Sequence, residues 1–191
     1  MRSLFPKPGN GLDKDEPGVI IENGLLLSRT RRQWRGGGGN SLLSIAVGSD
    51  ESAHLTDFVL RYLERRGESV RLFGPLAGEK AGWTDVAEAV ALEVSRGECD
   101  QGIIFCWTGT GVSIAANKIP GVRAALCADA KTAEGARKWN DANILAISLR
   151  ATSTQVASEI LDGWFSASPD DGERENINKV SLLEEKYFLK R

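Results

Sequence analysis

Histidine and cysteine are scarce in this sequence. Among 191 residues there are one His and three Cys, and the three cysteines are widely spaced. Three distant cysteines do not make a disulfide framework or a cysteine metal site, and a single His excludes a His-rich one. We therefore expect a protein of the reducing cytoplasm.

Long hydrophobic runs and a strong excess of either charge are also missing. No run of about 18 apolar residues could span a membrane, and no signal-peptide hydrophobic region stands at the start. The formal net charge of -2 implies no general attraction to nucleic acid. We expect neither a membrane nor a nucleic-acid partner, and the 41% hydrophobic and 26% charged content is ordinary for a globular domain.

Residues 1–40 differ from the rest of the chain. They contain three prolines, a basic run at 29–35 and four consecutive glycines at 36–39. We predict an N-terminal extension that is irregular or holds a short hairpin over 20–27, followed by a flexible joint. The basic run could touch phosphate or a partner subunit, although a solvated arm is the more common reading.

Residues 41–191 are predicted to form one α/β domain, because strands and amphipathic helices alternate along them. The expected strands cover 42–47, 70–73, 103–107, 122–127 and 144–147. The expected helices cover 51–66, 85–96, 112–118, 130–139, 152–165 and 173–189. This pattern predicts a Rossmann-like (flavodoxin-like) three-layer sandwich with a five-stranded parallel sheet and a long C-terminal helix. An apolar stripe on that last helix needs a covering surface, on this domain or on a neighbouring subunit.

The candidate catalytic segment of this domain is the stretch 102–118, with the sequence GIIFCWTGTGVSIAANK. It reads as a buried strand, a glycine-punctuated turn and a helix, an arrangement that aims backbone N–H groups at one point and can hold an anion. Cys106 and Thr108 stand at that edge. The nearby N–H dipoles favour a thiolate at Cys106, which makes it a candidate base or nucleophile. The alternative is a cysteine that only fills space at a strand end.

Five segments together resemble one known family. They are IAVGSD at 45–50, LFG at 72–74, CWTGTGVSIAANK at 106–118, GVRAAL at 121–126 and WNDANIL at 139–145. In this order and spacing they resemble the ribose-5-phosphate isomerase B family, which also contains the LacA and LacB galactose-6-phosphate isomerase subunits. The resemblance implies a sugar-phosphate aldose–ketose isomerase that acts through a cis-enediolate. It also implies no metal or organic cofactor, and a homodimer or homotetramer with active sites shared between subunits.

The resemblance also implies roles for individual residues. Cys106 would be the base that moves the proton, with Thr108 beside it. Trp107, Gly109, Thr110 and Gly111 would form the cradle of the oxyanion. The substrate-binding positions are Asp50, Glu51, Trp139 and Asn140, of which Asp50 and Asn140 would hold substrate hydroxyls. The candidate phosphate partners are Arg150, Arg174 and Lys179.

Two histidines common in the family are replaced here. Glu51 stands where many members have a His near the phosphate, and Trp139 stands where they have the His linked to ring opening. We therefore expect a substrate altered from ribose 5-phosphate. A non-catalytic sugar-phosphate-binding or regulatory relative is the alternative. A nucleotide-binding domain is disfavoured, because the Gly-Thr-Gly turn is too short for the dinucleotide pattern and no Walker motif occurs.

Overall fold

The computed structural model describes residues 21–22, 25–26 and 42–187. The chain divides into two units, Met1–Gly37 and Gly38–Arg191. In the first unit, β1 (Ile21–Glu22) and β2 (Leu25–Leu26) pair antiparallel. The predictions made for the basic run, for the glycine joint and for the chain beyond 187 lie outside the described residues.

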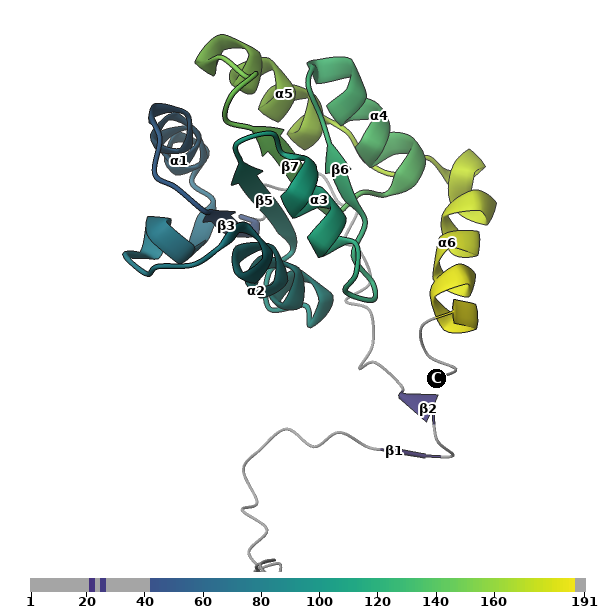
Figure 1. The fold of residues 1–191 in the computed structure, drawn as a ribbon. Helices are drawn as coiled ribbons and strands as arrows, with labels where there is room; N and C mark the ends of the chain where they lie inside the picture. The colour runs from purple at the N-terminus through teal and green to yellow at the C-terminus, as the bar shows by residue number, and fades with distance from the viewer. Residues whose placement is uncertain (1–20, 23–24, 27–41, 188–191) are drawn as a thin grey trace, which may run out of the picture. The chain divides into compact units, whose positions relative to one another are not determined.

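The second unit is built on a five-stranded parallel sheet, as the sequence predicts (Figure 1). Its strands are β3 (Ser44–Ser49), β4 (Ser69–Phe73), β5 (Gln101–Cys106), β6 (Ala124–Leu126) and β7 (Ile144–Ser148). They lie in the order β4-β3-β5-β7-β6. Numbered along the chain the order is 2-1-3-5-4, whereas flavodoxin has 2-1-3-4-5. The last two strands are thus exchanged, and the short β6 forms an edge.

Six α-helices and two 3-10 turns are seen in the described residues. The α-helices are α1 (His54–Arg66), α2 (Trp83–Ser95), α3 (Thr110–Ala116), α4 (Ala130–Asn140), α5 (Thr154–Ser166) and α6 (Arg174–Tyr187). The 3-10 turns are η1 (Gly74–Ala77) and η2 (Asp171–Glu173). The first helix starts three residues later than predicted. The hydroxyl of Ser49 bonds both the carbonyl and the amide of Glu51, which holds the chain in a turn there.

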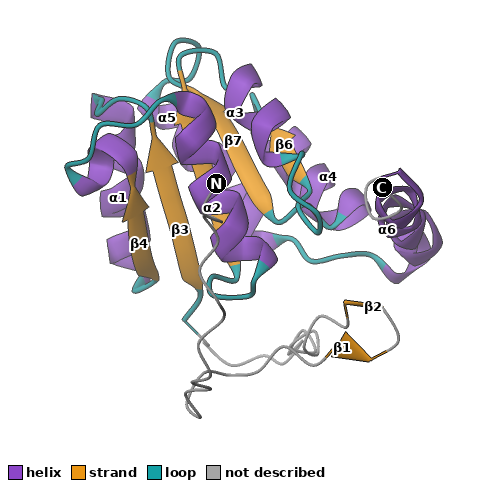
Figure 2. Ribbon diagram, turned by 60° about the horizontal axis from the view of Figure 1, so that its bottom comes forward, coloured by secondary structure: helices purple, strands orange, loops and turns teal. Residues whose placement is uncertain are grey.

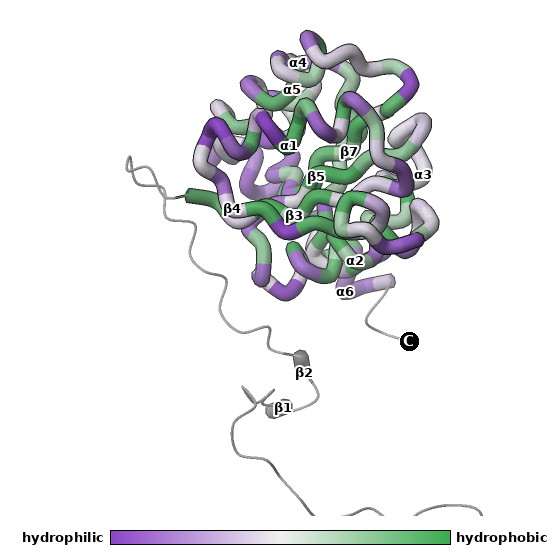
Figure 3. The backbone as a smooth tube through the Cα atoms, turned by 90° about the vertical axis from the view of Figure 1, so that its left-hand side faces the viewer, coloured by the Kyte–Doolittle hydropathy of each residue, from purple (hydrophilic) through white to green (hydrophobic). Residues whose placement is uncertain are grey.

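The helices cover both faces of the sheet and enclose two apolar cores (Figure 2). Side chains alternate between the faces along each strand. Ile103 and Phe105 of β5 point into the core covered by α1, α4 and α5, whereas Ile104 and Cys106 point into the core covered by α2 and α3. Figure 3 shows the central strands as a hydrophobic interior beneath more hydrophilic helices. The three-layer prediction is confirmed.

The connections leaving β3 and β5 diverge at the carboxyl ends of these strands, the position of the ligand crevice in open parallel sheets. After β3 the chain continues to β4 on one side, and it then crosses to β5 on the other side of β3. In open parallel sheets, ligands bind at the carboxyl ends of the strands where the connections diverge in this way. The residues that follow β3 and β5 are therefore the first place to look for a site.

The C-terminal helix α6 lies beside the amino end of the edge strand β6. Its carboxylate Glu184 accepts the backbone N–H of Gly121 with both oxygens, at 3.1 and 3.0 Å. None of its described residues is buried, and Leu183 and Tyr187 are more than half exposed. Among the described residues, the predicted apolar stripe is therefore largely exposed.

Candidate active site

Cys106 ends β5 and is followed by a tight turn. The side chain is buried, with 6% of the residue exposed, on the face covered by α2 and α3. Gly109 has a φ of 73°. A Cβ at Gly109 would lie 2.5 Å from Cδ1 of Leu126 and 3.0 Å from the backbone of Ile147 and Ser148. Only glycine meets both the conformation and the close approach.

The loop after β7 holds this turn in place. The amide of Leu149 donates to the carbonyl of Cys106 at 3.0 Å. The amide of Arg150 donates to the carbonyl of Trp107, also at 3.0 Å. The buried hydroxyl of Ser148 donates to that same carbonyl at 3.0 Å and accepts the amide of Ala151. These bonds fix the turn and bring Arg150, a predicted phosphate partner, directly beside it.

The donors of the predicted oxyanion cradle differ in availability. The Gly109 N–H, which the sequence assigned to the cradle, donates instead to the carbonyl of Cys106 at 3.2 Å. The amides of Thr110 and Gly111 belong to the first turn of α3, where helix geometry provides no acceptor. The hydroxyls of Thr108 and Thr110 are exposed and 2.7 Å apart. The usable donors are therefore the amides of Thr110 and Gly111 and this pair of hydroxyls.

Asp50 directly follows β3, the strand that neighbours β5. Ser49 of β3 pairs with Phe105 of β5, so the residues that follow them leave neighbouring strands side by side. Oδ1 of Asp50 is buried and has no hydrogen-bond partner among the residues that the structure describes. Removal from water raises the pKa of this carboxyl, and a backbone hydrogen bond partly opposes the rise. A buried polar atom without a partner is rare and is typical of a group that waits for a ligand. Glu51, the next residue, is exposed.

The remaining predicted residues lie near the amino ends of the strands, whereas Cys106 lies at the carboxyl end of β5. Helix α4 runs from the carboxyl end of β6 back to the amino end of β7, so its last residues, Trp139 and Asn140, are far along the strands from Cys106. They line a groove of about 400 Å³ with Glu173, Asn176, Ile177 and Val180. Arg174 pairs with Asp171, and Lys179 pairs with Glu175. Within one chain, the predicted site residues therefore form two groups that lie at opposite ends of the parallel strands.

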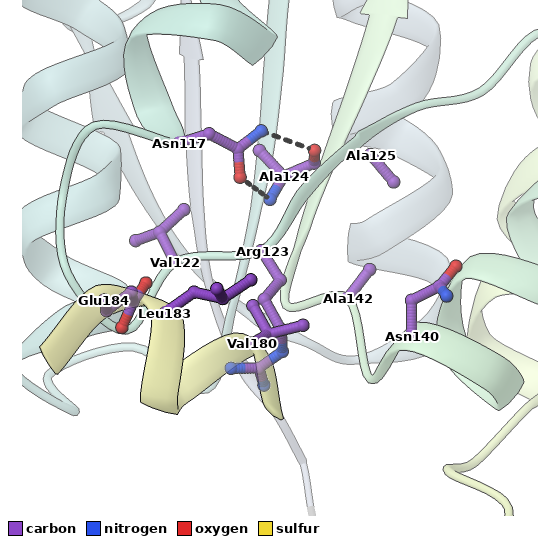
Figure 4. Close-up of a pocket in the computed structure, with 10 residues that line it drawn as sticks. All are labelled: Asn117, Val122, Arg123, Ala124, Ala125, Asn140, Ala142, Val180, Leu183 and Glu184. Atoms are coloured by element: carbon purple, nitrogen blue, oxygen red, sulfur yellow. Dashed lines mark hydrogen bonds between the residues drawn. The ribbon is translucent and has the colours of Figure 1, made fainter. Parts of the chain in front are cut away.

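A second groove, of about 430 Å³, lies between α6 and the start of β6 (Figure 4). Val122, Val180 and Leu183 give it an apolar lining. The side chain of Asn117 is already occupied, because it donates to the carbonyl of Ala124 at 2.8 Å and accepts its amide at 2.9 Å. This groove offers few free polar groups and is not where we place chemistry.

One further residue at the turn, Trp83, is not singled out by the sequence analysis. It begins α2, and its indole packs on Gly111. The only signal in the sequence is a large aromatic residue directly after Gly82.

Within 42–187 and the two short strands before it, no group of three or more His, Cys, Asp or Glu side chains could hold a metal ion. No helix in the same residues is long and apolar enough to cross a membrane.

Comparison with known proteins gives the family. The family model described as Ribose/Galactose Isomerase matches residues 45–182, and the chain belongs to this family of sugar-phosphate isomerases. It is 38% identical over 144 residues to ribose-5-P isomerase B of Listeria innocua, covering 75% of this chain and 96% of that protein. It is 35% identical over 146 residues to D-erythrulose-4-phosphate isomerase of Pectobacterium atrosepticum, covering 75% and 96%. Ribose-5-phosphate isomerase B of Clostridium thermocellum has a similar structure, with a TM-score of 0.71 and 39% identity over 76% of this chain and 99% of that one.

Proposed function

We propose that this protein interconverts an aldose phosphate and a ketose phosphate through a cis-enediolate, with Cys106 as the base. The observation that carries the proposal is the pairing of two groups at the sheet crevice. Cys106, which is buried, ends β5, and Asp50, whose Oδ1 is buried and without a partner among the described residues, directly follows the neighbouring strand β3. A base and a free acceptor for substrate hydroxyls are the two groups that this reaction needs first.

The proposed reaction uses the groups at the turn. The Cys106 thiolate takes the proton from the hydroxyl-bearing carbon next to the substrate carbonyl and returns it to the former carbonyl carbon. The hydroxyl proton moves in the same sense, from the oxygen on the carbon that loses its hydrogen to the former carbonyl oxygen, so the isomer forms with no net gain or loss of atoms. The amides of Thr110 and Gly111 and the hydroxyl of Thr108 would stabilise the oxyanion in between, because they are fixed before the charge develops.

Arg150 is the best-placed phosphate partner. Its amide is bonded to the turn, and its side chain is exposed at the same edge of the sheet. Glu51 would repel a phosphate dianion that lay close to it. We therefore place the phosphate toward Arg150 and assign Glu51 to a substrate hydroxyl.

We further propose that each site is completed by a second copy of the chain. Trp139 and Asn140 cannot reach Cys106 of their own chain, because they lie at the opposite end of the parallel strands. A homodimer in which α4 and α6 of one copy meet the crevice of the other would bring Trp139, Asn140, Arg174 and Lys179 to the substrate. It would also cover the apolar stripe of α6.

A mixing experiment tests the shared site. Cys106→Ser and Asn140→Ala would each be inactive alone. Mixed dimers would contain one intact site, so the mixture should regain about a quarter of wild-type activity in a two-fold symmetric dimer. No recovery, despite exchange of subunits shown by mass, would place both residues in one chain's site.

The substrate class is tested by proton exchange. Sugar phosphates of four to six carbons are incubated with the protein in deuterated water, and exchange at the carbon next to the carbonyl is followed by NMR. The relative named for D-erythrulose 4-phosphate supports the inclusion of four-carbon substrates. Exchange that depends on Cys106 supports the proposal. Binding without exchange of any of them would instead indicate a non-catalytic sugar-phosphate-binding relative.

A further inference from the structure

The indole of Trp83 lies directly on the turn that follows Cys106. A Cβ at Gly111 would be 3.1 Å from Cε3 of Trp83 and 3.3 Å from Cδ2 and Cζ3. The six-membered ring therefore packs against the Cα of Gly111. Because 44% of Trp83 is exposed, the residue has one side against the turn and another open to solvent.

The position of Trp83 is fixed by the start of α2. The carboxylate of Asp85 accepts the amide of Gly82 at 3.2 Å, which sets where the helix begins. One turn further, Val86 and Val90 pack on Gly48 of β3 so closely that a Cβ there would lie 2.6 and 2.8 Å from their methyl groups. The helix is thus anchored to the sheet. A rigid helix carries the indole, so its contact with Gly111 does not depend on a flexible loop.

We propose that Trp83 is a positioning residue for the isomerisation, acting through Gly111, and this rests on the function proposed above. The amide of Gly111 is one of the first-turn donors of α3 left for the developing oxyanion. The indole holds the Cα of Gly111 from one side and keeps water away from it. Donors stabilise an oxyanion best when they are fixed in advance and shielded from water, since competing water weakens each hydrogen bond. This also explains why residue 111 is glycine, because any side chain there would displace the ring.

The chain provides a matched control for an exposed apolar side chain that packs on a glycine. Leu42 is 62% exposed, and its Cδ2 would lie 3.3 Å from a Cβ at Gly67. Gly67 ends α1, at the amino edge of the sheet and away from the crevice. Truncation of Leu42 therefore removes a contact of the same kind without touching the turn.

The test compares Trp83→Ala, Trp83→Phe and Leu42→Ala with wild type in the full chain. The readouts are kcat, KM, Tm, and the fraction of product formed in deuterated water that carries deuterium at the new C–H bond. We expect Trp83→Ala to lower kcat roughly tenfold or more, within the ~10²–10³-fold known for losing an entire oxyanion donor. KM should change little, and the deuterium fraction should rise because water reaches the enediolate. Trp83→Phe should recover most of kcat, and Leu42→Ala should match wild type.

Three outcomes would overturn the inference. One is a Trp83→Ala protein with wild-type kcat and deuterium fraction. Another is a loss of activity that follows only a lower Tm, with no change in the deuterium fraction. If Trp83→Ala does not fold, Trp83→Leu takes its place, because it keeps apolar volume but not the flat ring. A wild-type protein inactive on every sugar phosphate overturns the proposed function together with this inference. If the wild type is active and the Trp83 variant has the same kcat and deuterium fraction, this inference alone is overturned.

Discussion

At the scale of single residues, the proposed function assigns the proton transfer to Cys106. We expect Cys106→Ser to keep the fold and lower proton exchange by ~10²–10⁴-fold, the usual contribution of a general base. The reason is that an alcohol is a far weaker acid than a thiol, so serine offers almost no anion at neutral pH. NMR-detected exchange in deuterated water measures the loss. Cys99→Ser is the control, because Cys99 is an equally buried thiol before β5, at the opposite end of that strand. Near-full activity of Cys106→Ser would mean that another group is the base.

We expect the Asp50 carboxylate to lower the stability of the fold and to support the isomerase activity. Burial raises the pKa of its carboxyl, so the charged form is less favourable in the folded chain than in the unfolded chain. We expect Asp50→Asn to raise the free energy of unfolding at pH 7 by ~1 kcal/mol, the lower end for an unsatisfied buried group, since solvent screens the rest of the side chain. The same change should lower isomerase activity, because the acceptor for a substrate hydroxyl is lost.

The pH dependence of this effect has a defined sign. A carboxyl with a raised pKa destabilises the fold above that pKa, and the penalty is relieved as the pH falls through it. The stability advantage of Asp50→Asn should therefore shrink as the pH is lowered from 7 toward 4, starting above the ordinary value of 3.8. Urea unfolding at several pH values measures it. A variant less stable than wild type at pH 7 would show that Asp50 is held by partners within the fold.

At the scale of elements, α4 and α5 approach backbone to backbone. A Cβ at Gly163 of α5 would lie 2.6 Å from the carbonyl oxygen of Ala130 in α4. Alanine usually stabilises a helix over glycine by about 1 kcal/mol. Here we expect Gly163→Ala to destabilise by roughly 1–2 kcal/mol, because overpacking against rigid backbone outweighs that gain. Gly135→Ala is the control, since its Cβ would meet only the half-exposed indole of Trp139, which can rotate away. Equal Tm values for the two variants would contradict this account.

The elements were largely predictable from sequence, because alternating strands and helices leave a strong periodic pattern. The fold class and the buried faces of α2 and β5 follow from that pattern. The later start of α1 did not, since it depends on the hydroxyl of Ser49 bonding to Glu51. The strand exchange at β6 and β7 was equally hidden, because strand order is a matter of long-range pairing.

The site was predictable in composition but not in arrangement. The motif from Cys106 to Gly111 and the position of Asp50 were visible in the sequence. Which amides of the turn are free was not, because the Gly109 N–H is used by a local bond. Trp83 could not be predicted as a site residue, because an exposed aromatic residue at the start of a helix belongs to no sequence motif. Only its packing on Gly111 in the structure connects it to the turn.

At the scale of the whole molecule, we propose that residues 1–40 are an extension to the 41–191 domain. All five strands of the parallel sheet lie between Ser44 and Ser148. We therefore expect deletion of residues 1–35 to leave a folded core with an unchanged Tm, measured by circular dichroism and gel filtration. Aggregation of the truncated chain would mean that the extension is an integral strand or a clasp between subunits.

The substrate should be a sugar phosphate that does not close into a ring. Ring opening needs an acid–base group at the ring oxygen, and Trp139, which stands where the resemblance places that group, has only an indole. The indole packs on Gly135 of its own helix, where a Cβ would lie 2.6 Å from the ring, and it remains 54% exposed. A bulky apolar wall of this kind would shorten the substrate pocket. A four-carbon aldose phosphorylated on its terminal oxygen has no hydroxyl placed to close a five-membered ring, so the missing acid costs it nothing.

This argument predicts that erythrose 4-phosphate or erythrulose 4-phosphate outperforms ribose 5-phosphate. The measurement is kcat/KM on each substrate for wild type and for Trp139→His, which restores an acid–base group and removes the wall. We expect Trp139→His to shift the ratio toward ribose 5-phosphate, while Trp139→Phe, which keeps an aromatic wall without an acid, leaves the four-carbon preference in place. A wild-type preference for ribose 5-phosphate of tenfold or more, about 1.4 kcal/mol in transition-state stabilisation, would refute the open-chain argument, because ring opening would then proceed without the histidine.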